Sequence, residues 1–197
     1  STLLMSYPVS SKKVASSIIS GPVVSQDFVI IGTDRSELIA FDKQSGQQKW
    51  QLALSSDVLA KPVIKDDKVL AKTTDGQLYA IDINNGKKLW TNHHGAPHFV
   101  LKASSSPVIY DDLVLAGYAD GKLDALDVNN GNLLWQRGVA FSSGASDVER
   151  LVDIDSTPVV KNGIAYLASY QGFVGAFSLK TGQFVWRKPA STHKDII

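Results

Sequence analysis

A 28-residue interval from a proline to a tryptophan recurs four times along this chain, and no other feature limits the fold as strongly. In each copy an alanine stands 18 residues after the proline and a glycine stands 24 residues after it. All four tryptophans of the chain occupy the last position of the interval. Self-similarity at a fixed period is typical of solenoids, propellers and other arrays of small units. The four units are residues 22–50, 62–90, 107–135 and 158–186.

Each unit has the pattern of a small antiparallel sheet. In the second copy, short apolar runs at 63–64 and 69–71 flank the polar turn 65–67. An Asp-Gly turn then leads into the alternating residues 78–82, and a last run ends on Trp90. Alternation interrupted by glycine-containing turns predicts β-hairpins. No segment has the helical period, so we expect an all-β chain.

Stacking around an axis is how small sheets of this kind bury both of their faces. We therefore predict a β-propeller whose four-stranded blades are the four units. The recurring residues have structural roles in such a fold. Alanine lets neighbouring blades approach, glycine takes the positive φ of a turn, and tryptophan fills the gap between blades. We do not expect these residues to form a catalytic set.

The composition excludes several function classes. Hydrophobic residues make up 44% of the chain, charged residues 20%, and the net charge is +1. This balance gives no general attraction to nucleic acid or to an anionic membrane surface. The absence of cysteine excludes disulfides, thiolate metal sites and a cysteine nucleophile. Residues 1–9 lack the pattern of a signal peptide, and because the chain does not begin with methionine we expect it to come from a longer gene product.

The type of blade is indicated by the spacing Ala-x-Asp-x-x-x-Gly-x-x-x-Trp, as in residues 80–90. This motif resembles the repeat of pyrroloquinoline quinone (PQQ) enzymes. The resemblance implies PQQ-like blades but not the cofactor, because quinone-binding relatives carry a vicinal cysteine pair and calcium ligands. This chain has no cysteine, so we expect no bound cofactor.

The connections between units lengthen along the chain, and loops carry most functions on repeat scaffolds. The two longer connections contain residues 93–104 and 142–158. Residues 147–158 of the second, Asp-Val-Glu-Arg-Leu-Val-Asp-Ile-Asp-Ser-Thr-Pro, resemble the signature Glu-Arg-Leu-x-Asp-Val-Asp-x-Thr-Pro of one propeller family. Residues 101–107 and 169–172 are similar to two further motifs of that family. It is the family of BamB, the lipoprotein B subunit of the bacterial outer-membrane β-barrel assembly machinery.

The resemblance implies more than the fold. Family members have eight blades, are lipid-anchored through an N-terminal cysteine, and lie at the periplasmic face of the outer membrane. They dock on the POTRA repeats of the barrel-forming subunit, help outer-membrane proteins to assemble, and have no known enzymatic activity. Residues 1–197 look like a middle portion of such a protein, a single partial propeller without the lipid-bearing cysteine.

Carried onto this chain, the family's docking surface falls on the two long connections. The implied partner-binding residues combine apolar anchors with charged neighbours, which is typical of a binding hot spot. An alternative is that Phe99 and Leu101 only cap the gap between blades. Equally, Asp153 and Asp155 could brace their own loop, with Arg150 as ion-pair partner. The set is Phe99, Leu101, Lys102, Arg150, Asp153 and Asp155.

Three more specific chemical roles are disfavoured by the sequence around the residues that suggest them. The order Asp153-x-Asp155-x-Thr157 matches the nucleophile motif of haloacid-dehalogenase-type phosphatases, but here it runs into the next blade instead of ending a parallel strand. The same acids lack the turn glycine and terminal glutamate of a calcium loop. His93, His94 and His98 have a spacing that could hold zinc, although solvated imidazoles on an exposed loop are the simpler interpretation.

The sequence thus predicts a non-enzymatic periplasmic scaffold of the barrel assembly machinery, with the POTRA repeats and unfolded client proteins as partners. The alternative is a propeller domain of a quinone- or sugar-dependent dehydrogenase whose active site lies outside this chain. Four blades of an eight-blade ring also leave two apolar faces uncovered, and we expect an isolated chain either to dimerise into a closed ring or to aggregate.

Overall fold

Four antiparallel sheets, each of four strands, make up the computed structural model, which describes residues 16–95, 105–118, 120–138, 157–168 and 173–189. Each sheet is formed by one contiguous stretch of chain, with its strands paired in sequence order. The predicted all-β propeller fold is therefore confirmed. Among the described residues, no helix is long and apolar enough to cross a membrane.

The strand bounds repeat from blade to blade. The first blade contains β1 (Ile18–Val24), β2 (Phe28–Thr33), β3 (Glu37–Asp42) and β4 (Gln48–Ala53). The second contains β5 (Val63–Lys65), β6 (Lys68–Lys72), β7 (Gln77–Asp82) and β8 (Lys88–His93). The third contains β9 (Val108–Tyr110), β10 (Leu113–Gly117), β11 (Lys122–Asp127) and β12 (Leu133–Gly138). The fourth contains β13 (Val159–Lys161), β14 (Ile164–Ala168), β15 (Phe173–Ser178) and β16 (Phe184–Pro189).

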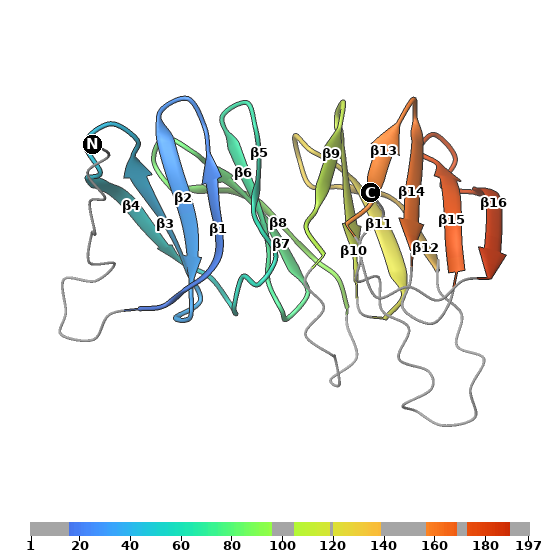
Figure 1. The fold of residues 1–197 in the computed structure, drawn as a ribbon, viewed down its shortest axis with the longest axis horizontal. Helices are drawn as coiled ribbons and strands as arrows, with labels where there is room; N and C mark the ends of the chain where they lie inside the picture. Colours follow the sequence, from blue (N-terminus) through green and yellow to red (C-terminus); the bar gives the residue numbers. More distant parts are fainter. Residues whose placement is uncertain (1–15, 96–104, 119, 139–156, 169–172, 190–197) are drawn as a thin grey trace, which may run out of the picture.

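The four sheets stand side by side in sequence order, as Figure 1 shows from blue at one end to red at the other. The first strands of the later blades lie close together, since β9 contacts both β5 and β13. This arrangement places the first strand of each sheet toward a shared axis and the last strand at the rim, as in a propeller.

Three apolar clusters fill the spaces between successive blades. One joins the first and second blades around Ile30, Leu38 and Tyr79, and a second joins the next pair around Leu70, Leu78 and Val114. The third joins the last pair around Leu115, Leu123 and Phe177. Each blade therefore has a face toward the preceding blade, here called its leading face, and a face toward the following blade, its trailing face.

The repeated tryptophan makes the same contact at every junction. Its indole N–H donates to a backbone carbonyl of the following blade, and its ring lies against the repeated glycine of that blade's turn. A Cβ added at these glycines would meet the tryptophan ring at 2.5–2.8 Å, too close for any larger residue. The hydrogen bonds are Trp50 Nε1 to Ile83 O at 2.7 Å, Trp90 Nε1 to Val128 O at 3.0 Å, and Trp135 Nε1 to Leu179 O at 3.1 Å.

The repeated alanine lies beneath the tryptophan of its own sheet. Ala80 pairs with Trp90 across β7 and β8, and the other three blades repeat this pairing. All four alanines are fully buried. In each sheet the ladder is irregular next to this pair, which indicates a β-bulge at the tryptophan.

Candidate functional site

The two long connections depart from neighbouring blades at the same edge of the propeller. The second blade's outer strand, β8, is followed by His94, whose backbone N–H donates to Gly76 O in the β6–β7 turn at 2.9 Å. The third blade's outer strand ends at Gly138, paired with Lys122 at the start of β11. The segments to which the connections return are also linked, because Ser106 N donates to Thr157 Oγ1 at 3.4 Å. Both connections are therefore anchored within one region of the molecule.

The partner-binding residues expected from the sequence lie outside the described residues. The structure gives the ends of their loops but not their own positions, so their roles stay predictions. They are Phe99, Leu101 and Lys102 in the first loop, and Arg150, Asp153 and Asp155 in the second.

A buried charged cluster lies at the base of these loops, between the second and third blades. Its centre is His94, whose side chain is 1% exposed. The ring nitrogen Nδ1 lies 2.6 Å from Asp124 Oδ2, and Nε2 lies 3.0 Å from Asp120 Oδ2. Both aspartates belong to the third blade, whereas His94 extends the outer strand of the second. The imidazole thus forms an ionic bridge between two blades.

Further groups surround the bridge. The imidazole stacks on the ring of Tyr118, with centroids 3.8 Å apart and planes 7° from parallel. The buried ammonium of Lys72 lies 5.3 Å from the centroid of the same ring and donates to Gly117 O at 2.6 Å and Ser105 Oγ at 3.1 Å. Lys122, at the exposed side, approaches Asp120 Oδ2 to 2.9 Å. Here Lys72 comes from the second blade and its partners come from the third, so it also joins the two.

The surroundings fix the protonation of the cluster. Burial disfavours a charged imidazole, but the hydrogen bonds and charges of Asp120 and Asp124 outweigh this effect and raise the pKa of His94 to about 9. Burial alone would raise the pKa of Asp120, yet hydrogen bonds from His94 and Lys122 hold it below its usual value. Burial, together with the two carboxylate charges, raises the pKa of Tyr118, so its hydroxyl stays neutral. His94 is therefore an imidazolium at neutral pH.

The equivalent junction between the first and second blades uses different chemistry. There the connection is held by hydroxyl groups: Tyr79 OH donates to Ser55 Oγ at 2.8 Å, and Ser36 Oγ donates to Asp57 Oδ1 at 2.8 Å. Neither contact requires two opposite charges inside the protein. The ionic bridge therefore distinguishes the junction below the two long loops from the junction between the first and second blades.

This arrangement suits positioning better than catalysis. Both ring nitrogens of His94 are engaged by carboxylates, so a protonated imidazole has no lone pair to act as a base. Within the described ranges, no group of three or more histidines, cysteines and acids has the arrangement of a metal site. A buried charge pair with fixed partners instead holds two backbone segments in one geometry.

Sequence reasoning did not identify this cluster. The sequence pattern suggests three solvated or zinc-binding imidazoles, but the structure buries His94. Of His93 and His94, the two that the structure describes, His93 is the exposed one. A signal was available in β11. Asp124 interrupts the apolar run Leu123-Asp124-Ala125-Leu126 on a strand expected to be buried, and a buried carboxylate requires a cationic partner.

Comparison with known proteins agrees with this description. A family model described as "Outer membrane protein assembly factor BamB" matches residues 8–197. BamB of Legionella pneumophila (strain Paris) is 56% identical over 187 residues, which are 95% of this chain and 49% of that protein. The crystal structure of BamB from Moraxella catarrhalis has a TM-score of 0.82 and 33% identity, and the match covers 89% of this chain and 54% of that one.

A more distant likeness concerns the fold alone. A quinohemoprotein alcohol dehydrogenase from Comamonas testosteroni has a TM-score of 0.73 but only 16% identity, over 89% of this chain and 35% of that one. Blades of this type thus occur in proteins with different activities.

The sheets, the tryptophan–glycine junctions and the two anchored connections define a β-propeller of PQQ-like blades that presents loops at one edge. Within that class, the chain belongs to the family of the outer membrane protein assembly factor BamB. It spans about half the length of the curated relatives that it matches.

Proposed function

We propose that this chain is part of a non-enzymatic scaffold that helps to assemble outer-membrane β-barrel proteins. The family match over residues 8–197 is the observation that carries this proposal. In this proposal the scaffold works at the periplasmic face of the outer membrane, the full-length protein is lipid-anchored, and residues 1–197 form one partial propeller domain. No cofactor takes part.

The proposed partner is the set of POTRA repeats of the barrel-forming subunit. The docking residues are Phe99, Leu101 and Lys102 on one loop and Arg150, Asp153 and Asp155 on the other. Two features support a joint site. The loops leave neighbouring blades at one edge, and the ionic bridge at His94 braces the junction between those blades. Loops on a rigid scaffold can present anchors with little loss of entropy on binding.

The alternative, a domain of a quinone- or sugar-dependent dehydrogenase, has less support. A likeness of 16% identity to a quinohemoprotein alcohol dehydrogenase concerns the blades and not a site. Unfolded client barrels remain a second proposed partner of the scaffold.

Binding of this chain to the isolated POTRA repeats tests the proposal, with calorimetry as the measurement. Leu101→Ala should weaken binding by about tenfold or more, as expected for an apolar anchor at the centre of an interface. The double variant Asp153→Ala/Asp155→Ala should weaken it to a similar extent.

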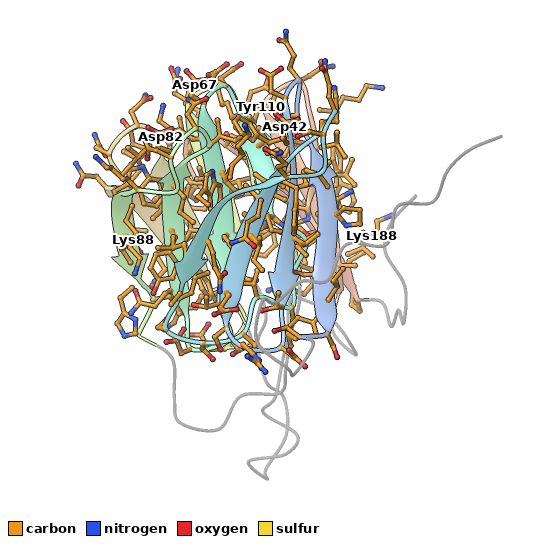
Figure 2. The ribbon with its side chains drawn as sticks, turned by 90° about the vertical axis from the view of Figure 1, so that its left-hand side faces the viewer. Asp42, Asp67, Asp82, Lys88, Tyr110 and Lys188 are labelled. Atoms are coloured by element: carbon orange, nitrogen blue, oxygen red, sulfur yellow. The ribbon has the colours of Figure 1, made fainter. Side chains whose placement is uncertain are left out.

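The matched control is Asp67→Ala/Asp112→Ala, which removes two carboxylates from exposed turns at the opposite edge, where Figure 2 labels Asp67. This control should bind like the wild type. Equal losses in both double variants would point to general electrostatic attraction and against a specific site. No binding by folded wild-type chain would overturn the docking proposal for these blades.

A further inference from the structure

Three asparagines of the chain are followed directly by glycine, and each of these pairs lies at a turn. Such a pair can react with itself, because glycine has no side chain to keep its backbone nitrogen away from the asparagine amide. The reaction requires a glycine nitrogen and an asparagine side chain that are not held by other groups. The three pairs are Asn85-Gly86, Asn130-Gly131 and Asn162-Gly163.

The first two pairs lie in the turns that receive a tryptophan, on the leading faces of their blades. Gly86 N–H donates to Asp82 O at 2.9 Å, and Gly131 N–H donates to Asp127 O at 2.8 Å. A tryptophan ring of the preceding blade also lies against each glycine. The nitrogen that would have to react is therefore hydrogen-bonded and covered in both turns.

The asparagine side chains of these two pairs are also engaged. Asn85 Nδ2 donates to Asp82 Oδ2 at 2.7 Å, and Asn85 Oδ1 accepts from Lys87 N at 2.9 Å. Asn130 Oδ1 accepts from Asn132 N at 2.8 Å. Bringing either amide to the glycine nitrogen would break these bonds and disturb a tryptophan junction.

The third pair is held much less tightly. Asn162 and Gly163 form the two-residue turn between β13 and β14, with φ 52° and 72°. Asn162 is exposed, and a Cβ on Gly163 would have no neighbour within 4 Å. Within the part of the chain that the structure describes, neither the Asn162 side chain nor Gly163 N–H has a hydrogen-bond partner.

The accessibility of this turn does not depend on where the chain ends. The equivalent turns Asp66-Asp67 and Asp111-Asp112 are exposed, although the second and third blades have a neighbour on each side. Asp66 and Asp111 both have φ 51°, so the first residue of all three turns has a similar backbone conformation. We therefore expect a blade after the fourth to leave Asn162 exposed.

We propose that Asn162 is a site of spontaneous deamidation. Gly163 N forms a bond with Asn162 Cγ, while the bond between Cγ and Nδ2 breaks. The amide nitrogen takes up the proton from Gly163 N and leaves as ammonia, so that a cyclic imide remains. Water then opens either C–N bond of the imide ring, which gives aspartate or isoaspartate at this position. This inference does not depend on the proposed function.

Little of the fold has to open for this reaction. The Asn162 backbone must rotate before Gly163 N can reach Cγ, and the neighbouring ladder between β13 and β14 contains three residue pairs. A short ladder beside an exposed turn opens locally at low free-energy cost. The same rotation in the other two turns would displace a tryptophan from its glycine.

The two products should affect the turn differently. Aspartate fits, because Asp66 and Asp111 occupy the same position in the second and third blades. Isoaspartate lengthens the main chain by one carbon, which the short turn between the paired residues Lys161 and Ile164 cannot accept without a change of register. Formation of isoaspartate should therefore loosen β13, the first strand of the fourth blade.

Incubation of the folded chain at mildly alkaline pH, followed by tryptic peptide mapping with mass spectrometry, tests the proposal. Cleavage after lysine and arginine places the three asparagines in separate peptides, 73–87, 123–137 and 162–180. Asn162 should be deamidated at least about tenfold faster than Asn85 and Asn130, because its turn opens at a lower free energy. Chromatography separates the aspartate and isoaspartate products.

The chain unfolded in guanidinium chloride is the matched control. There the three asparagines should react at similar rates, because no turn or tryptophan restrains them. In the folded chain, Gly163→Ala should slow the reaction at Asn162 by about tenfold or more, since the added methyl group hinders the attacking nitrogen. Asn162→Asp, which mimics one product, should unfold at the same denaturant concentration as the wild type.

A selective reaction at Asn162 in the folded chain, with similar rates at the three sites after unfolding, would establish the site. Equal rates in the folded chain would overturn the proposal, because the tryptophan junctions would then give no protection. No reaction at Asn162 over a period in which the unfolded chain reacts completely would also overturn it. An unchanged rate in Gly163→Ala would contradict attack by this nitrogen, and a loss of stability in Asn162→Asp would contradict the fit of aspartate in the turn.

Discussion

His94 is held by two carboxylates of the neighbouring blade, with its ring stacked on Tyr118 and the cations Lys72 and Lys122 nearby. A histidine in such surroundings keeps its proton well above neutral pH, and the structure raises its pKa to about 9. In the unfolded chain the ordinary value is about 6.5. The folded state therefore binds the proton more tightly, and the bridge contributes stability only while the imidazole is charged.

We expect this contribution to be fully present below about pH 6.5 and to be lost as the pH rises through about 9. The difference in unfolding free energy between wild type and His94→Gln should be about 3 kcal/mol at pH 6 and should shrink with increasing pH, since one pKa unit corresponds to about 1.4 kcal/mol. Urea unfolding at several pH values measures this difference. His93→Gln, at an exposed position, is the control and should show no such trend. A difference that stays constant with pH would mean that folding does not raise the pKa of His94.

At the scale of single residues, the sequence predicted the roles of residues that recur in every unit better than the roles of residues that occur in one unit. Trp50, Ala80 and Gly131 could be assigned structural roles because each occurs four times in register. The partner of Asp124 could not be assigned, because His94 follows the outer strand of another blade. Only the three-dimensional stacking of blades brings His94 and Asp124 together.

At the scale of elements, each junction depends on a glycine that leaves room for the preceding tryptophan. A Cβ at Gly131 would lie 2.5 Å from the ring of Trp90, whereas a Cβ at Gly163 would have no neighbour within 4 Å. Both glycines have φ 72°, so replacement by alanine imposes the same backbone penalty on each. The pair therefore separates conformational strain from loss of packing.

We expect Gly163→Ala to reduce the free energy of unfolding by about 1 kcal/mol, the cost of a left-handed backbone for alanine. Gly131→Ala should cost roughly 2 kcal/mol more, because the Trp90 ring must move from a well-packed site. Urea unfolding followed by circular dichroism compares the two variants. Equal losses would show that Trp90 moves aside without cost and that the glycine is required only for its φ.

The strands and their order were predictable because alternating apolar residues and glycine turns recur in every unit. The bulge beside each tryptophan was not, since an extra residue in one strand changes the ladder without changing composition. The predicted docking residues could not be assigned from the strand pattern at all. They were assigned through a family resemblance, and the structure describes only the strand ends that carry their loops. These residues are Phe99, Leu101, Lys102, Arg150, Asp153 and Asp155.

At the scale of the whole molecule, the blades are not equally protected. The second and third blades each contribute to two of the apolar clusters, whereas the first and the fourth each contribute to one. On the other face of the first blade, Ile31 and Ile39 are nevertheless buried, whereas Val159 and Trp186 of the fourth blade are exposed. Local opening depends on such contacts, because a sheet covered on only one face loses fewer buried apolar contacts when it separates from its neighbour. The stability of the arc should therefore decrease toward the fourth blade (Figure 1).

Hydrogen exchange should detect this gradient. In dilute solution, we expect backbone amides of β14 and β15 to exchange at least about tenfold faster than those of β6 and β7. Uniform protection across all four sheets would mean that the chain opens only as one cooperative unit.

The three tryptophan–glycine junctions are chemically alike, so they cannot by themselves tell one blade from another. The histidine between the second and third blades can, because among the described residues it is at this junction that a cation on one blade meets two acids on the next. A misassembled neighbour at this position would leave charges buried without partners, which costs several kcal/mol. The bridge should therefore favour the pairing of these two blades, from which both long connections start, over any pairing that leaves His94 without its two acids.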